Sequence, residues 1–133
     1  MLTRRGFASC ALCVVTGFTA TRAEAQNAPA GLKRTIITRT DGPMQGYETV
    51  NARVDLDAGA LVARHTHPGI ESSYVIDGAL ELSVDGQGTR TFRAGDGFQV
   101  PPQVPHSGKN GDKPTILAIT YVVEKGKPLA SPA

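Results

Sequence analysis

The sequence predicts an all-β fold, a sandwich or barrel of short antiparallel strands, from Lys33 onward. The clearest strand is TVNARVDL (49–56), where apolar and polar residues alternate as they do on a half-buried strand. Turn signals recur at short intervals, and no segment shows a convincing helical period; short strands between regular turns are typical of sandwiches and barrels. The turn signals are Asp41-Gly42-Pro43, Asp57-Ala58-Gly59, Pro68-Gly69, Asp77-Gly78, Asp85-Gly86, Gly95-Asp96-Gly97 and Asn110-Gly111-Asp112.

The remaining strand candidates are short runs between and after these turns. They are ALELSVDG (79–86), TRTFRAG (89–95), GFQVP (97–101) and TILAITYVV (115–123). The last run is apolar on both faces, which indicates a strand inside a sheet or at a subunit contact. We see no internal repeat and no second domain. We therefore expect one barrel at 33–124, between a flexible segment at 26–32 and a flexible tail at 125–133.

Residues 1–25 have the layout of a cleaved secretory signal: a basic start, a modestly apolar stretch at 11–20, and the small-x-small site Ala23-Glu24-Ala25. The apolar stretch is too short to span a bilayer, so we expect no stable membrane anchor. Thr3-Arg4-Arg5-Gly6-Phe7 is similar to the twin-arginine export motif. The alternative is an ordinary secretory signal with a chance Arg-Arg pair. Cleavage after Ala25 would place the mature chain in the periplasm.

The composition of the mature chain excludes several classes of function. Cys10 and Cys13 both lie in the predicted signal, so neither a disulfide nor a catalytic thiol is expected after cleavage. Residues 26–133 hold eleven Lys and Arg against eleven Asp and Glu. The basic residues are scattered, and the whole chain has only three Tyr and four Phe. This pattern does not indicate a nucleic-acid surface.

Two of the three histidines, His65 and His67, are one residue apart in ARHTH. On a strand both would project from the same face, with Leu61 and Ala63 behind them. Glu71 opens the next strand after a Pro-Gly turn, where a hairpin partner could reach back beside the histidines. Two imidazoles and a carboxylate in an apolar interior are costly unless a positive charge lies between them, and a divalent metal ion meets that need. A pair of surface histidines is the alternative for His-x-His alone.

The spacing around these residues favours the metal site, because two ordered motifs are present. The first is Gly59, five residues, His65-x-His67, three residues, Glu71, six residues, Gly78. The second is Gly95, five residues, Pro101, four residues, His106, three residues, Asn110. On these motifs the mature chain resembles the cupin superfamily, as a small single-domain member. One position departs from the pattern, because Gln103 stands where the second motif usually has glycine.

The resemblance implies an antiparallel jelly-roll barrel, or double-stranded β-helix, of about six to eight strands with one divalent metal ion inside. The residues that match its metal ligands are His65, His67, Glu71 and His106. Gly59, Gly78 and Gly95 would provide turns. Pro105 would restrain the backbone before His106, and Asn110 is interpreted as a turn residue rather than a ligand.

The expected ligand set does not select one metal. Nitrogen and oxygen donors without thiolate suit Fe(II), Mn(II), Ni(II), Cu(II) or Zn(II). Folding in the cytoplasm before export would allow a weak binder to be installed first, which favours Fe(II) or Mn(II). Three imidazoles and one carboxylate leave two octahedral positions open for water, a ligand or dioxygen, and an open position is typical of a catalytic site.

Two classes of function remain after the sequence is read. The first is an exported metal-dependent enzyme, dioxygenase-like, which acts on a small enol, catechol or carboxylate ligand; lyase and isomerase chemistry stay open. In that case Glu71 could release the metal and serve as a base. The second is a non-catalytic periplasmic metal- or small-ligand-binding protein, a store or a sensor. The fold alone does not decide between them.

Three further expectations concern packing and assembly. Tyr74 and Tyr121 could donate hydrogen bonds near the metal, but packing in the core is the expected role of each. Ser73 and Val75 share the face of Glu71 by the period of two. We also expect a homodimer, in which KRTIITRT (33–40) or the run at 115–123 forms the contact.

Overall fold

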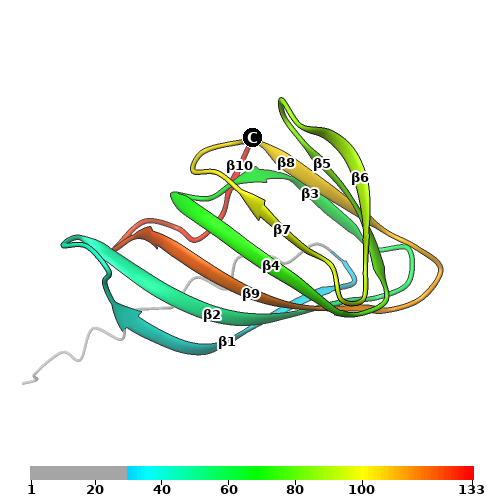
Figure 1. The fold of residues 1–133 in the computed structure, drawn as a ribbon, viewed down its shortest axis with the longest axis horizontal. Coiled ribbons are helices and arrows are strands. Elements are labelled where there is room, and N and C mark those ends of the chain that lie inside the picture. The colour runs from blue at the N-terminus through cyan, green and yellow to red at the C-terminus, as the bar shows by residue number, and fades with distance from the viewer. Residues whose placement is uncertain (1–29) are drawn as a thin grey trace, which may run out of the picture.

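The computed structural model describes residues 30–133, which form two antiparallel five-stranded sheets facing each other (Figure 1). The first sheet contains β1 (Leu32–Asp41), β2 (Tyr47–Leu56), β9 (Thr115–Glu124), β4 (Gly69–Asp77) and β7 (Gly97–Val100), in this order. The second contains β10 (Ser131–Pro132), β3 (Leu61–Thr66), β8 (His106–Asn110), β5 (Ala79–Val84) and β6 (Gly88–Arg93). The predicted signal at 1–25, and residues 26–29 of the predicted flexible segment, lie outside the described residues.

The path of the chain is that of a jelly roll. From β2 onward every connection crosses from one sheet to the other, except the β5–β6 hairpin. All the described strand pairs are antiparallel. The all-β antiparallel fold predicted from the sequence is therefore confirmed. The described residues form ten strands, more than the six to eight expected.

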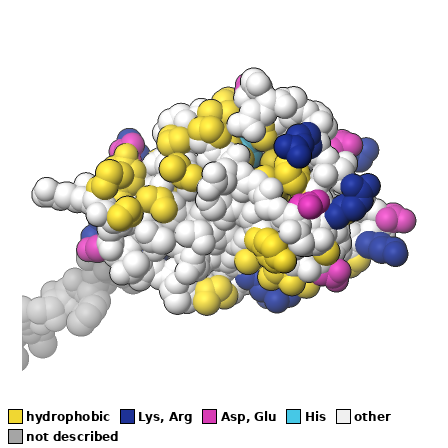
Figure 2. Space-filling model, viewed as in Figure 1, with side chains coloured by type: hydrophobic (Ala, Val, Ile, Leu, Met, Phe, Trp, Pro, Cys, Tyr) yellow, Lys and Arg dark blue, Asp and Glu magenta, His cyan; other side chains and the backbone are white. Residues whose placement is uncertain are grey.

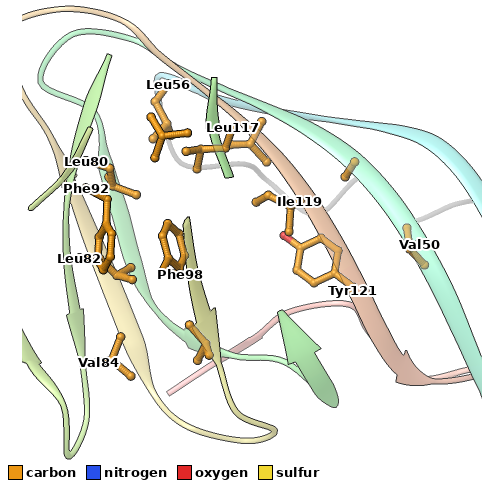
Figure 3. Close-up of a cluster of buried hydrophobic side chains, with 14 of the residues drawn as sticks. Val50, Leu56, Leu80, Leu82, Val84, Phe92, Phe98, Leu117, Ile119 and Tyr121 are labelled. Atoms are coloured by element: carbon orange, nitrogen blue, oxygen red, sulfur yellow. The ribbon is translucent and has the colours of Figure 1, made fainter. Parts of the chain in front are cut away.

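The core lies between the sheets and follows from the alternation of the strands. Val50, Ala52, Val54 and Leu56 of β2 all point inward, each 4% exposed or less, as TVNARVDL predicts. Phe92 of β6 and Phe98 of β7 bring the two sheets together, with ring centroids 4.9 Å apart. Figure 3 shows these side chains converging from opposite sheets. These contacts pack the two sheets face to face.

The run at 115–123 forms β9, which lies between β2 and β4 inside the first sheet. Of the two predictions made for this run, a strand inside a sheet or a strand at a subunit contact, the structure confirms the first. Its inward side chains include Leu117, Ile119 and Tyr121, all buried. Because β9 pairs along its length with both neighbours, it fixes the position of β4 and of the residues that β4 carries.

Two expectations about local structure were wrong. Strands β3 and β4 do not form a hairpin, because β3 pairs with β8 and β4 pairs with β7 and β9. The segment 125–133 is not a free tail, because Ser131 and Pro132 form β10 and pair with Thr66 and His65 of β3. A strand so short has little alternation to reveal it in the sequence.

The surface shows no concentration of one charge on the face drawn in Figure 2, where basic and acidic side chains are interspersed and hydrophobic side chains gather in small groups. Paired charges account for part of this pattern, as with Arg64 and Asp85 and with Arg53 and Asp55. No membrane-spanning helix is found among residues 30–133.

Candidate metal centre

The structure brings together the four residues that the sequence singles out. His65 lies on β3 and His106 is the first residue of β8, directly opposite it in the strand register. Glu71 lies on β4 in the other sheet, and His67 lies on the link between β3 and β4. One ligand atom from each residue lies within 4.8 Å of the others. The site therefore joins the two sheets across their common interior.

The inward direction of His65 depends on an irregularity in β3. The register between β3 and β8 shifts between Val62 and His65. As a result Val62 and His65, three residues apart, both line the interior, whereas Leu61 is 60% exposed. The expectation that Leu61 and Ala63 lie behind the histidines on one face was wrong. A bulge of this kind changes the side on which a side chain emerges, and bulges are common beside functional sites.

Glycine is required where the chain passes from His67 to Glu71. Gly69 is buried, and a Cβ atom at this position would overlap the carbonyl oxygen of Val122 on β9. Because glycine has no Cβ atom, β4 can begin in close contact with β9. The link between the two sheets can then be short, which keeps His67 and Glu71 side by side.

The outer nitrogen of each imidazole ring faces a backbone carbonyl. His65 Nδ1 lies 2.7 Å from the oxygen of Ala63, and His106 Nδ1 lies 2.9 Å from the oxygen of Val104. His67 Nδ1 lies 2.5 Å from the oxygen of Leu129. A carbonyl only accepts hydrogen bonds, so each Nδ1 carries the proton and each Nε2 carries a lone pair. Metal-binding histidines are held in this way by a hydrogen bond from the other ring nitrogen.

The three Nε2 atoms face one another and the carboxylate of Glu71. The Oε2 atom of Glu71 lies 2.8 Å from Nε2 of His67 and 3.4 Å from Nε2 of His106. Both nitrogens are buried, and neither makes a hydrogen bond of acceptable direction. Lone pairs and a carboxylate directed at one point repel each other unless a cation is present. The residues therefore fit a divalent metal ion with three nitrogen ligands and one oxygen ligand.

The acid–base properties of the site agree with this demand for positive charge. Burial, together with the neighbouring His106, lowers the pKa of His65 from 6.5 to about 4. Burial favours the neutral acid at Glu71, but the adjacent rings of His106 and His67 hold its pKa well below the ordinary value. Burial also opposes protonation of His106, yet the Glu71 carboxylate outweighs it and raises the pKa of His106. Without a metal, a proton is thus drawn to the place where the metal would lie.

Ser73 fixes the orientation of the Glu71 carboxylate. The two residues share the inner face of β4, as the period of two predicts, and both are buried. The Ser73 hydroxyl donates a 2.6 Å hydrogen bond to Oε1 of Glu71. Oε2 is left to face the histidines. This partner of Glu71 was detectable from the sequence by its position on the strand, although its role was not.

Tyr121 and Tyr74 differ in burial. Tyr121 is buried in the core as expected, and its ring packs 4.9 Å from the ring of His67. Burial, with a contribution from the charge of Glu71, raises the pKa of its hydroxyl. Tyr74 is 52% exposed, so its expected core packing was wrong. Tyr74 follows the buried Ser73 on β4 and points to the outer face of the sheet.

The second motif is held by two residues that are not ligand candidates. Gln103 adopts a φ of 60°, the conformation that a glycine would provide, and its backbone N–H donates to the carbonyl oxygen of His67. Asn110 is buried; its side-chain amide donates to three backbone carbonyls and its oxygen accepts from Thr115. Asn110 therefore secures a turn, in agreement with its interpretation as a turn residue.

Two groups near the site were missed by the sequence analysis. The carbonyl of Leu129 lies in the segment expected to be flexible. Arg34 lies on β1, and it lines the same hollow as His65, Glu71 and His106. The sequence did carry a sign of Arg34. Leu32, Arg34 and Ile36 alternate along β1, and this alternation places the arginine on the same face of the strand as its apolar neighbours.

Comparison with known proteins identifies the family. The description "Cupin domain" belongs to the family profile that matches residues 52–124. The chain belongs to the cupin family. The match covers β3, β4 and β8, which carry three of the four ligand candidates, and the link that carries His67. Among curated proteins, no match to this cupin is found.

Solved structures share the fold of this cupin. An RmlC-like cupin from Shewanella frigidimarina NCIMB 400 is 29% identical, with a TM-score of 0.59 over 72% of this chain and 79% of its own. KdgF from Halomonas sp. is 22% identical, with a TM-score of 0.62 over 76% and 86%. The DMSP lyase DddQ from Ruegeria pomeroyi DSS-3 is 18% identical, with a TM-score of 0.66 over 84% and 54%. These likenesses support the jelly-roll fold.

Proposed function

We propose that this cupin binds one divalent metal ion and is a metal-dependent enzyme that acts on a small oxygen-donor molecule. The observation that carries the proposal is the orientation of the three imidazoles. Each Nδ1 faces a carbonyl, so three Nε2 lone pairs and the Oε2 atom of Glu71 are directed at one point. The four residues are His65, His67, Glu71 and His106.

The surroundings of the four residues support a small substrate. The hollow beside them lies between the two sheets and is partly open to solvent. Most of its wall is aliphatic or aromatic, which is typical of small-molecule sites. A bound metal would supply Lewis-acid polarisation of an enol, catechol or carboxylate ligand, or a position for dioxygen.

We assign two roles to Glu71. It would hold the metal, and its carboxylate would be the group placed to accept a proton from a ligand bound there. Ser73 holds the second oxygen and aims the carboxylate. Dioxygenase-like oxidation is the reaction that we favour. The DMSP lyase among the fold neighbours makes lyase chemistry the next to test.

Metal analysis of protein purified without added metal tests the first part of the proposal. We expect about one divalent ion per chain, with Fe(II) or Mn(II) ahead of Zn(II), Ni(II) and Cu(II). His67→Ala should remove most of it, since it removes a ligand whose ring is held by Leu129. Glu81→Gln, an exposed acid on β5, is the control and should retain the metal. Stoichiometric metal in a His65/His67 double alanine variant would refute the site.

Oxygen uptake and product analysis with a panel of enols, catechols and 2-hydroxy acids test the second part. Glu71→Gln should lower turnover far more than metal content, because the amide ligates weakly and cannot take a proton. A strictly proportional loss of both would make Glu71 a ligand only. Ligand binding without oxidation, decarboxylation or isomerisation would instead identify a non-catalytic store or sensor.

Export to the periplasm is a separate proposal and rests on residues 1–25 alone. The twin-arginine-like motif and the site after Ala25 support it. Replacement of Arg4 and Arg5 by lysine should leave uncleaved precursor in the cytoplasm. Undiminished export of that variant would leave the general secretory route.

A further inference from the structure

Arg34 is a charged residue on the inner face of the first sheet, where most side chains are apolar and those of Glu71 and Ser73 on β4 are polar. It lies opposite the buried Val54 of β2 in the strand register, two residues after Leu32, which lines the same hollow. The same hollow is lined by Arg34, Glu71 and Tyr121. The arginine thus reaches toward the space that a ligand on the metal would occupy.

One hydrogen-bond donor of Arg34 is buried without an acceptor. Its Nε atom is buried without a hydrogen-bond partner. The guanidinium carbon of Arg34 lies over the ring of Tyr121, 5.8 Å from its centre. Among the described residues no carboxylate forms an ion pair with Arg34, and the carboxylate of Glu71 faces His67 and His106 instead. A guanidinium has five N–H donors, and a buried donor without a partner is costly.

We propose that Arg34 binds a carboxylate group of the substrate while other oxygen atoms of the same substrate bind the metal. This inference rests on the proposed function and narrows it, since it selects an anionic substrate over a neutral enol or catechol. Arginine presents its N–H donors as a flat fork that matches the two oxygens of a carboxylate. The carboxylate of the ligand would thereby supply the hydrogen-bond acceptor that the buried Nε atom of Arg34 lacks.

The charge around the hollow favours a singly charged group over a phosphate. Arg34 is the one lysine or arginine among the described residues that line it. The carboxylate of Glu71 faces the metal position, so its negative charge does not balance the positive charge of Arg34. A group with two negative charges would therefore remain partly uncompensated among aliphatic side chains.

Three 2-hydroxy acids test the inference on the Co(II)-substituted protein. Lactate, malate and 2-hydroxyglutarate share the metal-chelating group, and the last two add a second carboxylate at two different lengths. Dissociation constants are measured from the change in the Co(II) absorption spectrum. We expect at least one diacid to bind about tenfold more tightly than lactate, as for one charge-assisted hydrogen-bonded pair.

Substitutions on β1 identify the origin of that difference. Arg34→Gln should abolish the preference for the diacid and leave lactate binding and Co(II) content unchanged. Arg34→Lys keeps the charge but loses the fork, so the preference should narrow. Lys33→Gln removes the same charge from the exposed face of the same strand and should retain the full preference. Circular dichroism confirms that each variant is folded.

The outcomes separate the two proposals. Equal affinities for lactate and both diacids in the unsubstituted protein would overturn the role of Arg34 and leave the metal site standing. The role of Arg34 is likewise overturned if the full preference survives in Arg34→Gln or Arg34→Lys. Absence of any spectral change with all three acids would overturn the ligand-accepting metal site itself, and the role of Arg34 with it.

Discussion

Each oxygen of the Glu71 carboxylate has its own partner. Oε1 accepts the hydrogen bond of Ser73, and Oε2 faces His67 and His106. A carboxylate without such a partner rotates more freely and offers either oxygen to the metal. Groups that hold a ligand in place from behind affect metal affinity strongly, by about 10–100-fold on removal.

We therefore predict that Ser73→Ala weakens metal binding by about tenfold. The affinity is measured by competition with a chromophoric chelator at constant pH. Ser72→Ala is the matched control, because Ser72 accepts a hydrogen bond from Gln99 and not from a group at the site. Equal affinities of the two variants would contradict the role of Ser73.

Gln103 occupies a conformation that suits glycine better. Its φ of 60° costs about 1–2 kcal/mol for a side chain with a Cβ. Replacement by glycine gives back about 0.5–1 kcal/mol of chain entropy to the unfolded state. We predict a net gain for Gln103→Gly of about 0.5–1 kcal/mol, measured as an unfolding midpoint a few degrees higher. Gln87→Gly should act in the opposite direction, since Gln87 has no positive φ; a lower midpoint for both would refute the prediction.

Two histidines of the metal-free site should titrate on opposite sides of the ordinary value. Burial, and then His106, lowers the pKa of His65 to about 4, whereas Glu71 raises the pKa of His106. The unfolded chain protonates His65 first, so its contribution to stability is present above pH 6.5 and is lost as the pH falls toward about 4. The contribution of His106 is present below its ordinary pKa and is lost as the pH rises through the raised value. NMR titration measures both midpoints, and coincident midpoints would contradict the arrangement.

At the scale of elements, the segment after β9 completes the site from outside both motifs. The carbonyl of Leu129 fixes the tautomer of His67, and β10 pairs beside His65. The backbone N–H of Ala133 donates to the carbonyl of Arg64. The chain end is thus attached to the strand that carries the first ligand.

Two deletions separate these contacts. Removal of residues 131–133 takes away β10 and should weaken metal binding only slightly. Removal of residues 128–133 also takes away the Leu129 carbonyl, and we predict a further loss of about tenfold or more. Chelator competition measures both affinities. If the two deletions bind metal equally, the Leu129 carbonyl does not hold His67 in solution.

These elements also show what the sequence could predict. Alternation on 49–56 gives the direction of each side chain because it is a local property, and the structure confirms it. The resemblance of two motifs to those of cupins implied the four ligand candidates, and the structure brings these four residues together. Strand pairing is not local: nothing near His65 indicates that His106 lies opposite it, or that β3 shifts register at that point. The contribution of Leu129 is a backbone atom, which leaves no signal in the residue type.

At the scale of the whole molecule, the outer face of the first sheet carries exposed apolar side chains. Ile37 on β1 is 60% exposed, and Ile70, Tyr74 and Ile76 on β4 are 42%, 52% and 49% exposed. Strands β2 and β9 lie between the two groups, and Asn51, Arg53 and Thr120 line the same surface. Exposed apolar side chains on one face are common at protein contacts. It includes part of the segment 33–40, one of the two regions that we expected at a dimer contact.

We predict a homodimer that uses this face, measured by sedimentation at tens of micromolar. Ile37→Glu should shift the protein toward the monomer, because it places a charge in the contact. Thr91→Glu, on the exposed side of β6 in the other sheet, should leave the dimer intact. A monomeric parent protein would refute the prediction.

The order in which the site's parts appear along the chain has a consequence for protein synthesis. The ribosome makes His65 first, then Glu71 and His106, and Leu129 last. The tautomer of His67 is therefore unassigned until nearly all of the described chain has emerged, and a nascent chain offers only a partial set of ligands. At the proposed site, metal selection would then follow translation of these residues, and the compartment in which the chain folds would decide it. Protein folded in the cytoplasm and protein refolded in periplasmic extract should accordingly carry different ions.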